Sequence, residues 1–184
     1  MDKFILVVND WGGSIGLSYT INNPDKIKHL LITNPWIWLA KDGQYYSIFS
    51  GFVSGLIGRF LIKNFYFFGK VIIKKSIADK KNFNPTIYKH LETKKDRKGC
   101  WTFPKQIIAS SGWLDSLWQR RKKLSDIPKT LICVIKDIAF REKEFNVWNT
   151  ELTNKTIIKL DNVGHYPHEE AIEVFIEELK KVCT

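Results

Sequence analysis

The chain has 184 residues, which is long enough for one domain with a hydrophobic core and too short for two independent domains. Apolar residues make up 44% of it and aromatic residues 14%, a composition that excludes an intrinsically disordered protein. The net charge is +10, but the lysines are scattered and no nucleic-acid motif accompanies them, so we expect a solvated basic surface and no nucleic-acid partner.

Cysteine use and the N-terminal sequence bear on the compartment. Cys100, Cys133 and Cys183 are an odd number at unrelated spacings, so they predict neither a disulfide framework nor a zinc site. The N-terminus has none of the features of a secretory signal. An uncharged stretch, 43–58, has 16 residues, fewer than the ~20 that a spanning helix needs. We therefore predict a cytoplasmic protein without a membrane span.

The first elements read as a strand, a helix and a second strand. Residues 4–8 are a continuous apolar run, typical of a strand buried on both faces. A helical segment over 14–22 ends at Asn23 and Pro24, and a second short apolar strand covers 29–33. A strand–helix–strand unit of this length implies that the two strands are parallel.

The next part of the chain, 36–110, is rich in aromatic residues, and its apolar positions recur at helical spacing. Two neighbouring lanes show this spacing: Ile48, Phe52, Leu56 and Phe60, and Phe49, Val53, Ile57 and Leu61. We interpret 36–110 as a helical insertion between two parts of a sheet domain, 1–35 and 111–184.

The sheet pattern then returns. A helix marked by Trp113 and Trp118 precedes a buried strand over 130–135. A short helix over 145–152 leads to a strand over 156–160, and an amphipathic helix over 171–182 ends the chain. The predicted fold class is α/β, with a mostly parallel sheet and a helical insertion.

Three residues that can carry chemistry follow predicted strands. Asp10 stands at a sharp turn from the first strand into a helix, Asp137 follows the strand over 130–135, and His165 follows the strand over 156–160. Open α/β sheets keep their sites at the carboxyl ends of strands. Each residue alone is more often structural: an Asp before Gly-Gly is usually a turn residue. Their order, nucleophile, acid and histidine, is that of α/β-hydrolases and favours a catalytic triad.

A metal site is the other interpretation of this region. His165 and His168 stand three residues apart, as paired ligands on a helix do. The chain has no HExxH motif to accompany them, so we expect no metal.

The turn sequence Val7-Val8-Asn9-Asp10-Trp11-Gly12-Gly13 resembles the nucleophile elbow of haloalkane dehalogenases. Three further stretches resemble the same family: Thr33-Asn34-Pro35-Trp36-Ile37-Trp38, Lys136-Asp137-Ile138-Ala139-Phe140-Arg141 and Gly164-His165-Tyr166-Pro167-His168-Glu169-Glu170. The Asp-Trp-Gly-Gly elbow alone is shared with epoxide hydrolases, and its combination with the other stretches is more specific. The resemblance covers nearly the whole chain and implies a partial α/β-hydrolase fold, with 36–110 as its helical cap.

The resemblance implies a reaction and roles. Asp10 would displace a halide from carbon and form an alkyl ester, and His165, oriented by Asp137, would activate the water that hydrolyses it. The indole N–H of Trp11 would bind the halide, and its backbone N–H would supply half of an oxyanion hole. The implied partner is a small apolar, halogenated substrate, and the resemblance implies no metal or organic cofactor.

The elbow lies only ten residues from Met1, whereas a complete hydrolase of this type has several strands ahead of it. By resemblance, a second oxyanion donor and a second halide ligand would lie upstream of Met1. We therefore expect an N-terminally truncated product that is poorly stable and weakly active or inactive alone, because the strand over 4–8 would keep an unpaired side.

Two other functions stay open. An epoxide hydrolase shares the aspartyl ester and needs cap tyrosines to protonate the opening ring; Tyr45, Tyr46, Tyr66 and Tyr88 are available. A non-catalytic remnant, or a binding protein that uses the basic surface, is the alternative of another class.

Overall fold

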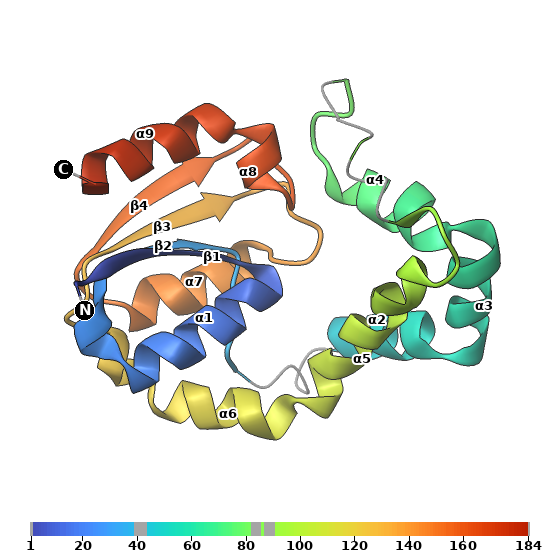
Figure 1. Ribbon diagram of the computed structural model, residues 1–184, viewed down its shortest axis with the longest axis horizontal. Coiled ribbons are helices and arrows are strands. Elements are labelled where there is room, and N and C mark those ends of the chain that lie inside the picture. Colours follow the sequence, from blue (N-terminus) through green and yellow to red (C-terminus); the bar gives the residue numbers. More distant parts are fainter. Residues whose placement is uncertain (1, 39–43, 82–85, 87–90, 184) are drawn as a thin grey trace.

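The computed structural model describes residues 2–38, 44–81, 86 and 91–183 (Figure 1). Four strands form one sheet in the order β1–β2–β3–β4, and every neighbouring pair is parallel. The strands are β1 (Phe4–Asn9), β2 (Ile27–Thr33), β3 (Lys129–Val134) and β4 (Lys155–Leu160). The parallel sheet predicted from the sequence is confirmed, and each strand begins or ends within two residues of its predicted bounds.

Helices cover both faces of the sheet (Figure 1). They are α1 (Asp10–Asn22) and α7 (Glu142–Glu151) on one face and α9 (Ile172–Cys183) on the other. Successive side chains of β2 point to opposite faces, so Leu30 packs with Leu17 of α1 while Leu31 packs with Phe175 of α9. This alternation explains why the central strands are apolar at every position rather than at every second one.

The prediction that residues 4–8 are buried on both faces is wrong. Within this strand, β1, only Val8 is buried, and Phe4 and Val7 are exposed. The reason is position, because β1 is the end strand of the sheet and pairs with β2 alone among the described residues. The contrasting case is β3, which has neighbours on both sides and is buried along its whole length.

The helical segment between β2 and α6 lies beyond the carboxyl ends of the strands (Figure 1). Its helices are α2 (Gln44–Ser54), α3 (Leu56–Phe65), the π-helix η3 (Phe68–Ile73), α4 (Lys74–Ser76), the 3-10 helix η5 (Asp96–Lys98) and α5 (Gly99–Ala109). The remaining helices are η1 (Pro24–Lys26), α6 (Ser111–Gln119), η6 (Arg121–Leu124) and α8 (Pro167–Glu170). The boundaries between the sheet domain and the helical insertion, at 35/36 and 110/111, stay a prediction.

Two apolar helices of this segment meet at a bend. The chain breaks between α2 and α3, whose axes differ by 59°. A Cβ atom on Gly58 would lie 2.1 Å from the carbonyl oxygen of Phe52, so only glycine permits this turn. No single described helix is long and apolar enough to cross a membrane, although α2 and α3 pass that test together as a bent pair. The cytoplasmic location stays a prediction.

Candidate active site

Asp10 is the first residue of α1 and has a left-handed backbone conformation, with φ of 47°. Such a conformation is strained for a residue other than glycine, and strained residues concentrate at functional sites. The elbow also needs a close approach, because a Cβ atom on Gly13 would lie 2.3 Å from Cβ of Pro35. Strand, sharp turn and helix together present the Asp10 side chain at the carboxyl edge of the sheet.

Asp137 is buried just beyond β3 and accepts four hydrogen bonds. Its Oδ1 accepts the backbone N–H groups of Ala139, at 2.6 Å, and Phe140, at 3.1 Å. Its Oδ2 accepts from Nδ2 of Asn34 and from Nδ1 of His165, the latter at 2.9 Å. Four donors hold the carboxylate in one orientation and replace the water lost on burial.

His165 follows β4 in a loop that is held from the helical segment. Its backbone N–H donates to the carbonyl oxygen of Ser76 at 2.8 Å. The carboxylate of Glu170 accepts from the backbone N–H of Gly164, at 3.1 Å, and of Ala78, at 2.7 Å. These bonds tie the histidine loop to the end of α4 and fix the height of the imidazole above the sheet.

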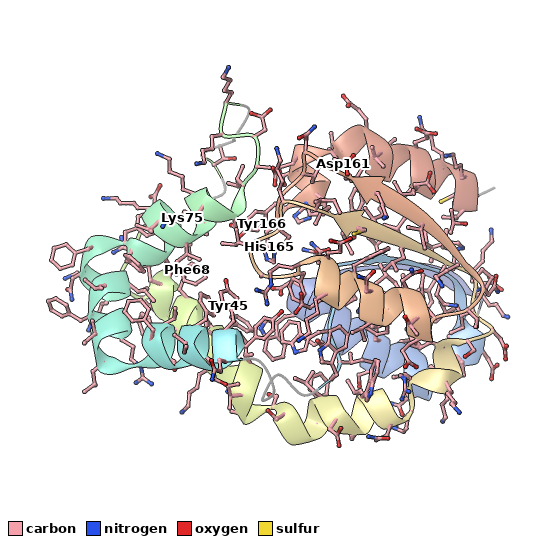
Figure 2. The ribbon with its side chains drawn as sticks, turned by 180° about the vertical axis from the view of Figure 1, so that it is seen from behind. Tyr45, Phe68, Lys75, Asp161, His165 and Tyr166 are labelled. Atoms are coloured by element: carbon pink, nitrogen blue, oxygen red, sulfur yellow. The ribbon has the colours of Figure 1, made fainter. Side chains whose placement is uncertain are left out.

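Asp10, Trp11 and His165 line one cavity of about 150 Å³. The rest of its wall is largely aromatic: Trp36, Tyr45, Tyr46, Phe49, Phe68, Phe103, Phe140 and Tyr166. Figure 2 shows His165 and Tyr166 between the sheet and the helices that carry Tyr45 and Phe68. The cavity therefore combines an apolar wall with one carboxylate and one imidazole, the composition of a site for a small apolar substrate.

The electrostatics of the site are those of a coupled carboxylate and imidazole. Desolvation by burial raises the pKa of Asp10, and the charge of His165 and the backbone N–H of Trp11 partly oppose this. Burial acts to lower the pKa of His165, but the hydrogen bond and charge of Asp137, with the charge of Asp10, outweigh it and leave the pKa raised. The charges of Asp10 and His165 therefore favour each other, whereas burial disfavours both.

No family model matches the chain. Among curated proteins, haloalkane dehalogenase 2 of Mycobacterium tuberculosis is 25% identical over 177 residues, which cover 93% of this chain and 61% of that protein. A cis-3-alkyl-4-alkyloxetan-2-one decarboxylase of Shewanella oneidensis is 24% identical over an alignment of 194 positions and is covered to 60%. The chain therefore spans about three fifths of the length of the curated relatives that it matches.

Solved structures of haloalkane dehalogenases resemble this chain in fold. The haloalkane dehalogenase DatA of Agrobacterium tumefaciens superposes with a TM-score of 0.78 at 18% identity, over 97% of this chain and 65% of DatA. The chain has the α/β-hydrolase fold of the haloalkane dehalogenases. The dehalogenase DbeA of Bradyrhizobium elkanii, in its M1 loop variant, has a TM-score of 0.77 at 17% identity, with coverage of 98% and 67%.

Within this α/β-hydrolase fold, the structure brings together the residues that the sequence singled out. Asp10, Trp11 and His165 share the cavity, and Asp137 contacts His165 from outside it. These residues are far apart in the sequence but close in space, because β1, β3 and β4 are parallel and end at the same edge of the sheet. His168 is exposed and does not line the cavity. Among the described residues, no three His, Cys, Asp or Glu side chains gather as a metal site would require.

Sequence reasoning missed two residues that position the candidate site. Asn34 and Glu170 lie in the stretches that carried the family resemblance, but no role was assigned to either. Asn34 has a positive φ, 44°, at the end of β2 and binds Asp137, whereas Glu170 fixes the histidine loop. Only the position of Asn34, directly after a strand, was a usable signal.

The cap tyrosines considered for an epoxide hydrolase fall into three groups. Tyr45 and Tyr46 line the cavity, but their hydroxyls donate to the carbonyl oxygens of Ile138 and Ala139. Burial and the Glu144 carboxylate also raise the pKa of Tyr46, which makes it a poorer acid. Tyr66 is not among the cavity residues and contacts Arg97 instead, and Tyr88 lies outside the described residues.

Proposed function

We propose that this chain carries the catalytic machinery of a hydrolase that cleaves carbon–halogen bonds through an ester of Asp10. The observation that carries the proposal is the strained Asp10 elbow, which shares an apolar cavity with His165 while Asp137 binds the far side of the imidazole at 2.9 Å. This arrangement provides a nucleophile, a base and an orienting acid, the three parts of a covalent hydrolase.

In the first step, an oxygen of the Asp10 carboxylate attacks the carbon that bears the halogen, and the halide leaves with the bonding electrons. A carboxylate attacks in its ionised form, and the charge of His165 and the backbone N–H of Trp11 favour that form of Asp10 against the effect of burial. The apolar wall removes water from the nucleophile, and Trp11 supplies an N–H donor, a group suited to the leaving anion. The product of this step is a neutral alkyl ester of Asp10 and a halide ion.

In the second step, Nε2 of His165 takes a proton from water, and the resulting hydroxide attacks the carbonyl carbon of the ester. The bond between the carbonyl carbon and the alkoxide oxygen then breaks, the imidazolium of His165 returns its proton to that oxygen, and the alcohol leaves. The remaining proton passes from Asp10 to solvent, which restores the carboxylate. Formation of the ester also prepares the base, because it removes the Asp10 charge that helps to raise the pKa of His165. The imidazole is therefore more often neutral in the intermediate, where it must accept a proton, than in the free protein.

We also propose that 36–110 acts as the cap over this site. The helices that carry Tyr46, Phe49 and Phe68 supply much of the apolar wall, and Ser76 binds the histidine loop. The small size of the cavity and its apolar wall fit a short haloalkane rather than a polar metabolite. A second halide ligand and a second oxyanion donor are unassigned among the described residues.

Mass spectrometry of a His165→Gln variant incubated with a short bromoalkane tests the proposal. We expect the mass to increase by one alkyl group on the peptide that contains Asp10, because the ester forms but is not hydrolysed. His168→Gln is the matched control, since His168 is exposed three residues away, and it should turn over without accumulating the adduct. Absence of both adduct and halide release would support the non-catalytic alternative.

Product analysis separates the reactions that share this fold. Halide release from haloalkanes is the expected outcome. Diol formation from epoxides without halide release would favour the epoxide hydrolase. The structure disfavours that reaction, because the hydroxyls of Tyr45 and Tyr46 already donate hydrogen bonds to backbone carbonyl oxygens. The similarity to an oxetan-2-one decarboxylase supports a second candidate, and release of CO₂ from such a lactone without halide release from haloalkanes would select it.

A further inference from the structure

The outer side of α2 and α3 exposes large apolar side chains. Leu56 is 87% exposed, and Ile48 and Ile57 are each 69% exposed. Three aromatic residues, Phe52, Phe60 and Phe65, are also exposed on these two helices. We call these six residues the apolar tip: Ile48, Phe52, Leu56, Ile57, Phe60 and Phe65. Contiguous exposed apolar surface of this kind marks an interaction site, since it costs free energy in water.

The tip residues repeat at helical spacing within each of the two helices. Ile48 and Phe52 are four residues apart on α2, Leu56 and Phe60 are four residues apart on α3, and the rings of Phe60 and Phe65 are in contact, with centroids 5.8 Å apart. Figure 1 shows α3 at the end of the molecule farthest from the sheet. None of the six residues lines the cavity, so the reaction does not account for them.

The charged residues along this segment of the chain have one sign. Residues 44–78 contain five basic residues and no Asp or Glu. The basic residues are Arg59, Lys63, Lys70, Lys74 and Lys75, and all five are exposed. Arg59 and Lys63 are interleaved with the tip on α3, one helical turn apart.

We propose that the apolar tip inserts into the surface of an anionic lipid bilayer, with the five cations against the lipid headgroups. Helices that combine a large apolar face with Lys and Arg and lack acidic residues lie in the interface of anionic membranes. The 59° bend between α2 and α3 suits insertion of the tip at the interface and not a straight span. A second copy of the chain is a poorer occupant, because a symmetric contact would bring two sets of five like charges together.

Flotation of the full chain with vesicles tests this proposal. We expect roughly tenfold or more binding to vesicles of phosphatidylcholine with phosphatidylglycerol over phosphatidylcholine alone. The variant Arg59→Gln/Lys63→Gln should weaken binding about fivefold for each cation removed. Leu56→Ser/Phe60→Ser should weaken it by roughly tenfold or more, because the inserted apolar area is lost.

Matched controls and a second measurement make the result decisive. Lys122→Gln/Lys123→Gln removes the same charge from η6, and Ile172→Ser/Ile176→Ser removes exposed apolar area from α9; neither should change vesicle binding. Circular dichroism checks that each variant folds, and sedimentation velocity checks its size. Equal binding to both vesicles, or no binding with a tip-dependent change in oligomeric state, would overturn the proposal. The proposal is independent of the dehalogenase reaction, because no substituted residue lines the cavity.

Discussion

At the scale of single residues, two positive φ angles stand out, at the ends of the neighbouring strands β1 and β2. Asp10 opens α1 with φ of 47°, and Asn34 ends β2 with φ of 44°. Asparagine tolerates this conformation better than most residues, so Asn34 combines a backbone role with a side-chain role. Its amide donates to the same Oδ2 of Asp137 that binds His165, which makes Asn34 a positioning residue for the acid.

The variant Asn34→Gly tests that side-chain role, because glycine keeps the positive φ and removes only the amide. Loss of a hydrogen bond to a buried charged group should lower the free energy of unfolding by about 2 kcal/mol. The hydrogen bond from His165 to Asp137 should then strengthen, raise the pKa of His165 further and move the acidic limb of the hydrolysis rate to higher pH. The pH–rate profile and denaturant unfolding measure the two effects.

Asn154→Gly is the matched control, since Asn154 also has a positive φ, 46°, but is exposed and outside the site. It should leave the pH profile unchanged. An Asn34→Gly profile identical to that of the parent chain would show that the amide does not influence His165.

The raised pKa of His165 also predicts a pH dependence of stability. A group with a higher pKa in the folded state binds its proton more tightly there, so protonation stabilises the fold. This contribution is fully present below the unfolded pKa of about 6.5 and is lost as the pH rises through the raised folded pKa. The difference in unfolding free energy between the parent chain and His165→Gln should therefore shrink as the pH rises above neutrality. A difference that grows with pH would mean that the folded pKa is lowered.

At the scale of helices and strands, two glycines of α1 determine how closely this helix packs against its neighbours. α1 can lie close to the chain after β2 because Gly13 has no side chain, and it can lie close to β1 because Gly16 faces Val8. A Cβ atom at Gly16 would lie 2.5 Å from Cγ1 of Val8. The helix dictates the direction of the Asp10 side chain, so the spacing of α1 from its neighbours affects the geometry of the site.

Substitution of Gly13 by alanine should therefore cost about 2 kcal/mol of stability, because its Cβ would overlap Pro35 Cβ at 2.3 Å. Halide release should also fall, since α1 must move and Asp10 moves with it. Gly12→Ala is the control in the same turn: nothing lies within 4 Å of its added Cβ, and alanine should stabilise the helix by up to about 1 kcal/mol. Thermal unfolding measures the difference in stability between the two variants. Equal melting temperatures would contradict the prediction.

At the scale of the whole molecule, the exposed strand β1 is the feature with the largest consequence. It ends the sheet among the described residues, its Phe4 is exposed in contact with Tyr19 of α1, and its Val7 is also exposed. An apolar end strand offers unpaired backbone groups and apolar surface to other chains. We therefore expect the 184-residue chain to self-associate at this edge as its concentration rises.

A charged residue on the end strand should reduce that association. Val7→Lys places a cation on the exposed side of β1, and lysine on edge strands opposes strand pairing between molecules. We expect severalfold lower light scattering at equal concentration. Ile172→Lys, which adds the same charge to the exposed surface of α9, should have little effect. An equal reduction by both variants would attribute the change to net charge alone.

The amino-acid sequence by itself determined the α/β class, the parallel strands and the three residues at strand ends, because apolar runs and turn residues are local signals. Tertiary structure alone decided that β1 is half-exposed, that α2 and α3 bend at Gly55, and that Asn34 and Glu170 hold the site. Burial and hydrogen bonding between distant residues depend on which strands are neighbours, and a periodic pattern along one segment carries no information about its neighbours. The same holds for the apolar tip: the sequence predicted its helical spacing, but only the tertiary structure showed that its side chains are exposed.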